Sequence, residues 1–134
     1  MDEQRAPNLE EMDEQQAQQF LTEMFSNLSA EQEYQIRHED YIMEMPQSGE
    51  RIRGREKMRA FQEAYPHPPS IQLRRVVVRD RLWLVEGVND YGEGQVISVV
   101  AIFELRDAKI FRDTRYYAEP FEVPEWRAQW VERM

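Results

Sequence analysis

The N-terminal half of the chain carries apolar residues at helical spacing. They recur three and four positions apart, at Ala17, Phe20, Leu21, Met24, Phe25 and Leu28. This stripe predicts a helix over residues 12 to 28. Ser29 with Gln32 three residues later is a capping-box pattern, which predicts a second, short helix over residues 30 to 38. A third helix is expected from Arg55 to the segment PHPP, because proline cannot continue a helix.

Most of the later chain has the two-residue period of strands. Strands are predicted in DYIMEM and over residues 71 to 79, 82 to 91, 95 to 105 and 110 to 117. The segment QSGERIRG is expected to be a loop. Pro124 is expected to begin a final helix whose Trp126 and Trp130 anchor it on the sheet or on a partner chain. Short turns make the four later strands antiparallel neighbours. Together these elements predict an α+β fold, a curved and mostly antiparallel sheet wrapped around N-terminal helices, with an internal pocket between the layers.

Composition narrows the class of protein. The 134 residues include 26 acidic and 17 basic side chains, a net charge of -9, which argues against nucleic acid or an anionic membrane surface as a partner. There is no cysteine and the two histidines are far apart, so neither a disulfide framework nor a metal site is expected. The acidic start lacks the apolar segment of a signal peptide, so we expect a cytoplasmic protein. Residues 1 to 11 are expected to be a loose acidic arm, and residues 12 to 134 a single domain.

Charged and aromatic residues alternate in FRDTRYYAEPF, residues 111 to 121. In a strand, Phe111, Asp113, Arg115 and Tyr117 would share one face. Asp113 in an apolar cavity could exchange a proton with a ligand, with Arg115 orienting it. Alternatively, the two residues form a charge pair on the wall or rim of the fold. Both interpretations stay open at this point.

Other strands supply candidates for the lining of a pocket. The residues predicted to contact a ligand are Tyr41, Met43, Met45, Trp83 and Asn89, together with Tyr117 of the last strand. Gly87 leaves room for a ligand where a side chain would fill space, and Asn89 could lie across from Asp113 and Arg115 as a polar contact. His38 is expected at the end of the second helix, as a capping or surface histidine.

Several segments resemble the SnoaL-like, polyketide cyclase-like branch of the nuclear transport factor 2-like superfamily. They are MEMPQSGERIRGREKMRAF, FELRDAKI, YYAEPF and EWRAQWVERM, and the resemblance runs from residue 12 onward. It implies a cone-shaped fold of the cystatin-like type whose cavity takes a small hydrophobic molecule, with no cofactor, and a homodimer made through the sheet. It does not imply one activity, because the superfamily spans enzymes and binding domains.

The positions that match known sites of the superfamily restrict the activity. Ketosteroid isomerases place carboxyl and tyrosine side chains where this chain has Met45, Val99 and Leu21, so the resemblance argues against that activity and leaves Val99 as a pocket residue. The polar residues of limonene epoxide hydrolase-like enzymes are not matched either. SnoaL-like cyclases use an acidic residue on the last strand in an aldol-type ring closure, and Asp113 matches it.

The predicted function is therefore an apolar pocket for a small hydrophobic molecule. In one version the protein is a cofactor-independent cyclase, isomerase or hydrolase that uses Asp113 as acid or base. In the other it is a non-catalytic ligand-binding or dimeric interaction domain of the same fold. The resemblance implies two or three pocket carboxylates or histidines in a catalytic member, and the sequence offers only Asp113.

Overall fold

The computed structural model describes residues 6–134. The helical elements are a 3-10 turn η2 (Leu9–Glu11), helices α1 (Glu14–Ser26), α2 (Ala30–Gln35) and α3 (Arg55–Ala64), and a 3-10 turn η3 (Glu125–Arg127). The strands are β1 (Arg37–Met45), β2 (Glu50–Arg53), β3 (Ser70–Arg79), β4 (Leu82–Asp90), β5 (Val96–Arg106) and β6 (Lys109–Ala118). No helix among the described residues is long and apolar enough to cross a membrane.

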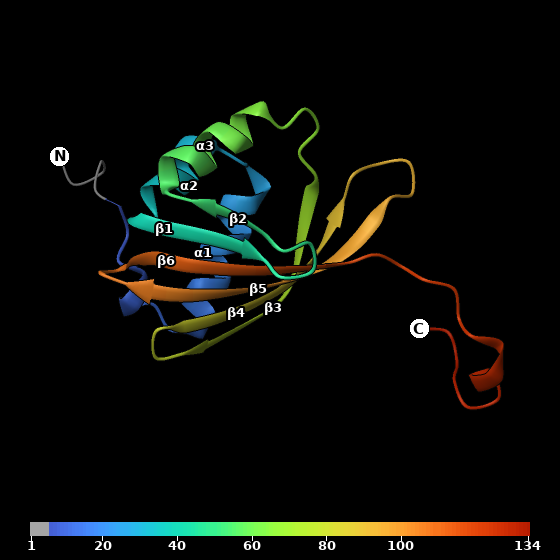
Figure 1. Ribbon diagram of the computed structural model, residues 1–134. Coiled ribbons are helices and arrows are strands. Elements are labelled where there is room, and N and C mark those ends of the chain that lie inside the picture. The colour runs from blue at the N-terminus through green and yellow to red at the C-terminus, as the bar shows by residue number, and fades with distance from the viewer. Residues whose placement is uncertain (1–5) are drawn as a thin grey trace.

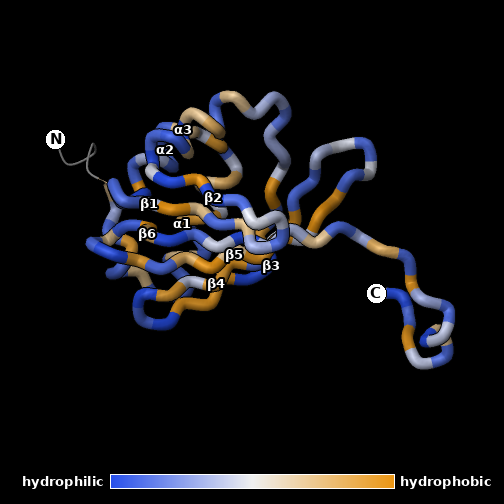
Figure 2. Tube along the Cα trace, viewed as in Figure 1, coloured by the Kyte–Doolittle hydropathy of each residue, from blue (hydrophilic) through white to orange (hydrophobic). Residues whose placement is uncertain are grey.

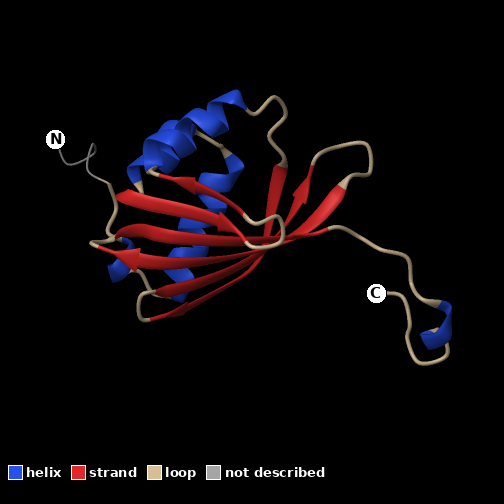
Figure 3. Ribbon diagram, viewed as in Figure 1, coloured by secondary structure: helices blue, strands red, loops and turns tan. Residues whose placement is uncertain are grey.

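The six strands form one curved sheet in the order β2-β1-β6-β5-β4-β3. All neighbours are antiparallel except β1 and β6, which run parallel and join the N-terminal and C-terminal halves of the chain. The helices lie on the concave side, where α1 packs against β3, and α3 packs against α2, β1 and β2 (Figures 1 and 3). The predicted α+β class, with a curved and mostly antiparallel sheet around the helices, is confirmed.

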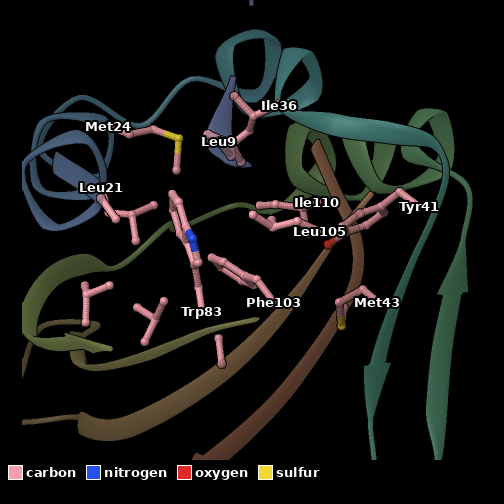
Figure 4. Packing of buried hydrophobic residues seen from close by; sticks show 14 of the residues in the cluster. Leu9, Leu21, Met24, Ile36, Tyr41, Met43, Trp83, Phe103, Leu105 and Ile110 are labelled. Carbon is pink, nitrogen blue, oxygen red and sulfur yellow. The ribbon is translucent and has the colours of Figure 1, made fainter. Parts of the chain in front are cut away.

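The hydrophobic core lies between α1 and the inner face of the sheet. Figure 4 shows Trp83 pointing toward α1, with Leu21 and Met24 directed back at it and Phe103 on the sheet side. Hydropathy along the chain follows this arrangement, because apolar segments run through the central strands and a hydrophilic segment forms the turn between β3 and β4 (Figure 2). The helical stripe that predicted α1 is therefore the side of the helix that closes this core.

The sequence identified most elements correctly, but it misplaced the boundary between α2 and the first strand. α2 ends at Gln35, so His38 lies in β1 and not at a helix end as expected. The ring is 8% exposed, its Nε2 lies 3.1 Å from Asp107 Oδ2, and its Nδ1 accepts from the backbone N–H of Asp40. The expected loop QSGERIRG also contains strand β2, which pairs with β1.

The start of the chain is more closely attached than the predicted arm over residues 1 to 11. Leu9 is fully buried, and its backbone N–H donates to the carbonyl of Ala108 in the β5–β6 turn. Glu10 accepts from the N–H of Ala108 at 2.6 Å and pairs with Arg81. The prediction of a loose arm is therefore wrong for Leu9–Glu11, and its first five residues lie outside the described part of the chain.

The C-terminal segment differs most from expectation. Pro124 precedes only the short turn η3, and not a helix. Trp126 and Trp130 are about three-quarters exposed, so they do not anchor the segment on the sheet of their own chain. Figure 1 shows this segment leaving the end of β6 and running away from the sheet.

A β-bulge in β6 changes which side chains face the interior. Glu104 pairs with Arg112 and Leu105 pairs with Ile110, so Phe111 is the extra residue in the ladder. As a result, Ile110 and Asp113 are both buried. The expectation that Phe111 shares the face of Asp113 is wrong, because simple alternation fails across a bulge.

Gly87 allows the sheet to bend sharply at a second irregularity. The register of β3 against β4 shifts between Leu73 and Arg75, and a Cβ built on Gly87 would lie 2.9 Å from the backbone oxygen of Gln72. Real Cβ atoms do not approach a carbonyl oxygen so closely, and here the neighbour is backbone that cannot rotate away. The glycine is therefore required by the close passage of β3 over β4.

Replacing Gly87 with alanine is expected to lower the free energy of unfolding by about 1–3 kcal/mol, because the added methyl group forces the two strands apart. Chemical denaturation measures this change. Ser98→Ala, at an exposed strand position on β5, is the control and should stay within about 0.5 kcal/mol. Equal stability of the two variants would show that β3 shifts without cost.

Candidate functional site

A cavity of about 380 Å³ lies between the helices and the concave face of the sheet. Its wall is mainly apolar, and it is bounded at the helical side by Met24, Phe25, Leu28, Met58 and Phe61. A wider, more polar hollow of about 1020 Å³ lies next to it, between the β1–β2 loop, the segment after α3 and the β4–β5 turn. Met45, Tyr65, Tyr91 and Tyr117 line both spaces. The outer hollow is therefore a vestibule of the inner cavity.

The buried carboxylate of Asp113 holds a cluster of polar groups at the cavity wall. Register places it between Met43 of β1 and Phe103 of β5, and it is 1% exposed. Tyr41 donates its hydroxyl to Oδ2 at 2.6 Å. Arg115 donates from Nε to both carboxylate oxygens at 3.1 Å and from Nη2 to Oδ2 at 2.8 Å. Asp113 and Arg115 therefore form a charge pair in the cavity wall.

The environment fixes the charge states of the two donors. Burial raises the pKa of the Tyr41 hydroxyl well above its usual range, and the charge of Asp113 raises it further. For Arg115, burial acts to lower the pKa, but the adjacent Asp113 outweighs this and the pKa is raised well above its usual value. Tyr41 is therefore a neutral hydroxyl donor and Arg115 a cation at neutral pH.

Arg115 has hydrogen-bonding capacity left over. Its guanidinium group carries five N–H groups. Among the described residues, Nε and one N–H of Nη2 are used by Asp113, and one N–H of Nη1 reaches the hydroxyl of Tyr117 at 3.3 Å. The remaining two N–H groups belong to a side chain that lines the cavity and is 21% exposed. Arg115 is thus a donor available to a molecule in the cavity.

A second polar cluster in the cavity wall was missed by the sequence analysis. Glu33 of α2 accepts on Oε1 from Arg37 at 3.3 Å and from Gln62 of α3 at 3.1 Å, and Arg37 donates to Gln62 at 2.7 Å. All three side chains line the cavity. The spacing of Glu33 and Arg37, four residues apart, was a visible signal. This spacing is also that of an ordinary ion pair on the surface of a helix. Because the helix was predicted to continue to residue 38, the sequence did not indicate that Arg37 begins a strand.

The cavity contains most of the residues predicted to bind a ligand. The lining residues among them are Met43, Met45, Asn89, Val99 and Tyr117, with Asp113 and Arg115. Tyr41 lies behind Asp113, outside the lining. Trp83 belongs to the core against α1, and its indole N–H is buried with no hydrogen-bond partner among the described residues.

Three tyrosines, Tyr65, Tyr91 and Tyr117, lie at the junction of the cavity and the vestibule. Asn89 donates to the hydroxyl of Tyr91 at 3.2 Å, so it belongs to this group and makes no bond to Asp113 or Arg115 in the described structure. Burial raises the pKa of Tyr65, and the neighbouring Tyr91 and Tyr117 raise it further. The sequence suggested that Asn89 could complete a site with Asp113, and in the structure it pairs with Tyr91 instead.

Within residues 6–134, no three histidine, cysteine or acidic side chains are grouped as metal ligands would be.

Comparison with solved structures places these features in a family. An NTF-2 like protein of unknown function from Burkholderia xenovorans is 33% identical, with a TM-score of 0.75, over 87% of this chain and 94% of that one. The "putative ketosteroid isomerase" of Kribbella flavida is 25% identical, with a TM-score of 0.80, over 91% and 92% of the two chains. A limonene epoxide hydrolase-like (LEH-like) enzyme of Mycobacterium tuberculosis shares the fold, with a TM-score of 0.62 at 17% identity over 75% and 79%.

Comparison with curated proteins gives no match. The family model described as a SnoaL-like domain matches residues 16–113, which run from α1 through the buried carboxylate of β6. This span covers most of α1, helices α2 and α3, the first five strands and half of β6. It includes every residue that lines the cavity except Arg115 and Tyr117. The chain belongs to the SnoaL-like domain family of the nuclear transport factor 2-like superfamily.

Proposed function

We propose that the inner cavity binds a small, largely apolar molecule and that Arg115 donates hydrogen bonds to an acceptor oxygen on it. One observation carries this proposal: a mainly apolar cavity of about 380 Å³ has in its wall a charged arginine with unused N–H groups. Binding sites for small molecules have this size and character, with few polar groups fixing the orientation. A guanidinium group only donates, and a carbonyl oxygen is a neutral acceptor that suits its free N–H groups.

Asp113 and Tyr41 then act as positioning residues. The Asp113 carboxylate accepts hydrogen bonds from the Tyr41 hydroxyl and from Nε and Nη2 of Arg115. These bonds hold the guanidinium group in one orientation. Proton exchange between Asp113 and a ligand would require breaking these bonds. The geometry therefore favours ligand binding over the acid–base role that the sequence allowed for Asp113.

A second candidate function keeps Asp113 as the acid or base of a cofactor-independent enzyme. Two observations favour it, since Asp113 lines the cavity and the chain is similar to the protein of Kribbella flavida described above. In this version Arg115 polarises a carbonyl group of the substrate and Asp113 accepts the proton that this activates. Replacing Asp113 separates the two candidates.

The cavity proposal predicts that the neutral fluorescent dye phenylnaphthylamine binds inside. Val99 lines the cavity, and Val99→Phe should weaken binding by about tenfold or more because the ring fills the space. Val100→Phe is the matched control, since Val100 pairs with Glu86 and Tyr116 and is not part of the lining. Fluorescence titration measures both. Equal weakening by the two substitutions would place the dye elsewhere.

The positioning role predicts that Asp113→Asn destabilises the protein. The change leaves Arg115 without its counter-ion, and breaking a buried pair in this way costs about 3 kcal/mol, the lower end of the usual range because Arg115 is partly exposed. Glu104→Gln, which touches Arg112 at 3.9 Å in an exposed pair, should change stability by less than about 0.5 kcal/mol. A stable Asp113→Asn variant that binds ligands but has lost a measurable activity would support the enzyme instead.

We also propose that the protein forms a homodimer in which the C-terminal segment of one chain covers the outer sheet face of the other. That face carries Val77, Leu84 and Ile102 side by side in the register of three strands. The C-terminal segment exposes Phe121, Trp126 and Trp130 to solvent. Exposed apolar groups of this size are typical of protein interfaces, and tryptophan is enriched among their strongest contacts.

Light scattering during size-exclusion chromatography tests the dimer. The native chain is expected at the mass of two chains, and the double variant Trp126→Ala/Trp130→Ala at the mass of one, because the loss of two buried indoles removes several kcal/mol of contact energy. Phe61→Ala removes an exposed aromatic ring from α3, outside the C-terminal segment, and should leave the mass unchanged. A native chain that is monomeric throughout the concentration range would refute the proposal.

A further inference from the structure

The cavity has a second polar group that the proposed function does not use. The side chain of Glu33 lines the cavity, and the residue is 8% exposed. Both hydrogen bonds to this carboxylate, from Arg37 and from Gln62, end on Oε1. Among the described residues, Oε2 accepts no hydrogen bond. A carboxylate oxygen has room for further donors, so Oε2 is an acceptor available at the cavity wall.

The neighbours of Glu33 hold its carboxylate in place. Gln62 uses its amide N–H on Glu33 and its carbonyl on Arg37. Arg37 donates to both residues, and its guanidinium carbon lies 5.0 Å from the centre of the Tyr41 ring. These contacts fix the direction of the Glu33 carboxylate. The cluster therefore offers a ligand one preoriented acceptor.

Arg115 and Glu33 lie in opposite layers of the cavity and have opposite hydrogen-bonding roles. Arg115 belongs to the sheet and offers donors, whereas Glu33 belongs to the helical layer and offers an acceptor. Each is paired with a residue of opposite charge, Arg115 with Asp113 and Glu33 with Arg37. The four charges cancel, so a charged ligand would have no counter-ion in the cavity. Burying an unpaired charge is costly, and a neutral molecule is favoured.

We infer that the ligand is a neutral hydroxycarbonyl compound, with an apolar skeleton, a carbonyl oxygen facing Arg115 and a hydroxyl group donating to Glu33 Oε2. This inference rests on the proposed function, because it concerns the same cavity. A hydroxyl group is the neutral donor that suits a carboxylate, and the residues between the two layers, such as Met43, Met58 and Ile110, suit the skeleton.

Calorimetric titration with alkyl phenyl ketones tests this pairing. One series carries a hydroxyl group at the end of alkyl chains of increasing length, and the matched series carries fluorine there, which has similar size but donates no proton. At one chain length the hydroxyl compound should bind about tenfold or more tightly than its fluoro counterpart, since a hydrogen bond to a charged group is worth that much. Compounds that end in a carboxylate should bind more weakly than either.

Two variants assign the preference to Glu33. Glu33→Gln should reduce the hydroxyl-over-fluorine ratio at least threefold while the fluoro ketones bind as before. Glu31→Gln is the matched control, because Glu31 lies on the same helix but pairs with Arg59 outside the cavity. If Glu33→Gln fails to fold, the ratio measured on the native protein still decides.

The outcomes separate the two levels of the argument. Equal affinity of the hydroxyl and fluoro ketones at every chain length overturns the inference about Glu33, while ketone binding that is weakened by Val99→Phe still supports the cavity. If Glu33→Gln still prefers the hydroxyl ketones over the fluoro ketones as strongly as the native protein does, the inference about Glu33 is also overturned. If no ketone binds, and the dye does not bind either, both the inference and the proposed function are wrong.

Discussion

A carboxylate buried among methionine and aromatic side chains is stable only when its lone pairs are satisfied, and Asp113 is satisfied by two residues from different halves of the chain. Tyr41 lies on β1 and Arg115 on β6, so the hydrogen bonds of Asp113 reinforce the one parallel seam of the sheet. β1 in turn carries the contacts to α2 and α3. Removal of Asp113 would therefore loosen both the arginine and the seam that holds the helical layer over the sheet.

The cavity exists because the sheet is bent at irregular points that binary patterning does not specify. A bulge at Phe111 turns both Ile110 and Asp113 inward, and the shift between Leu73 and Arg75 lets β3 curl over Gly87. Bulges increase the local twist and bend of a strand, which separates its far end from the helices. Side chains of the helices and of the sheet do not fill the space that results, so the polar groups in its wall face the cavity.

The fold was readable from the sequence because its strongest signals are periodic. The stripe from Ala17 to Phe25 and the strands after Ser70 follow helix and strand periods over many residues. Met43 could be placed in the cavity for the same reason. Val99 was chosen because its position matches a site residue of the superfamily, and Asp113 because the resemblance turns its face of the strand inward. Glu33 and Arg37 could not be placed, because their burial depends on how α2 packs against α3. Trp126 and Trp130 are exposed in the single chain, so of the two predicted anchoring places the chain's own sheet is wrong. Alternation also fails at Phe111, where a bulge adds a residue that no local pattern announces.

The parallel pairing of β1 with β6 also has consequences for the order of folding. The hydrogen bond between Tyr41 and Asp113 joins residues 72 positions apart, whereas the pairings of β3 with β4, β4 with β5 and β5 with β6 are all formed by short turns. Local hairpins close early and contacts of high sequence separation close late, since the entropy of a long loop must first be overcome. The three-hairpin meander therefore assembles first, and β6 keeps an open edge until β1 docks on it. Until β1 docks, the open edge of β6 can also pair with a strand of another chain. Docking of β1 is therefore the folding step that is most sensitive to protein concentration, both during synthesis and during refolding.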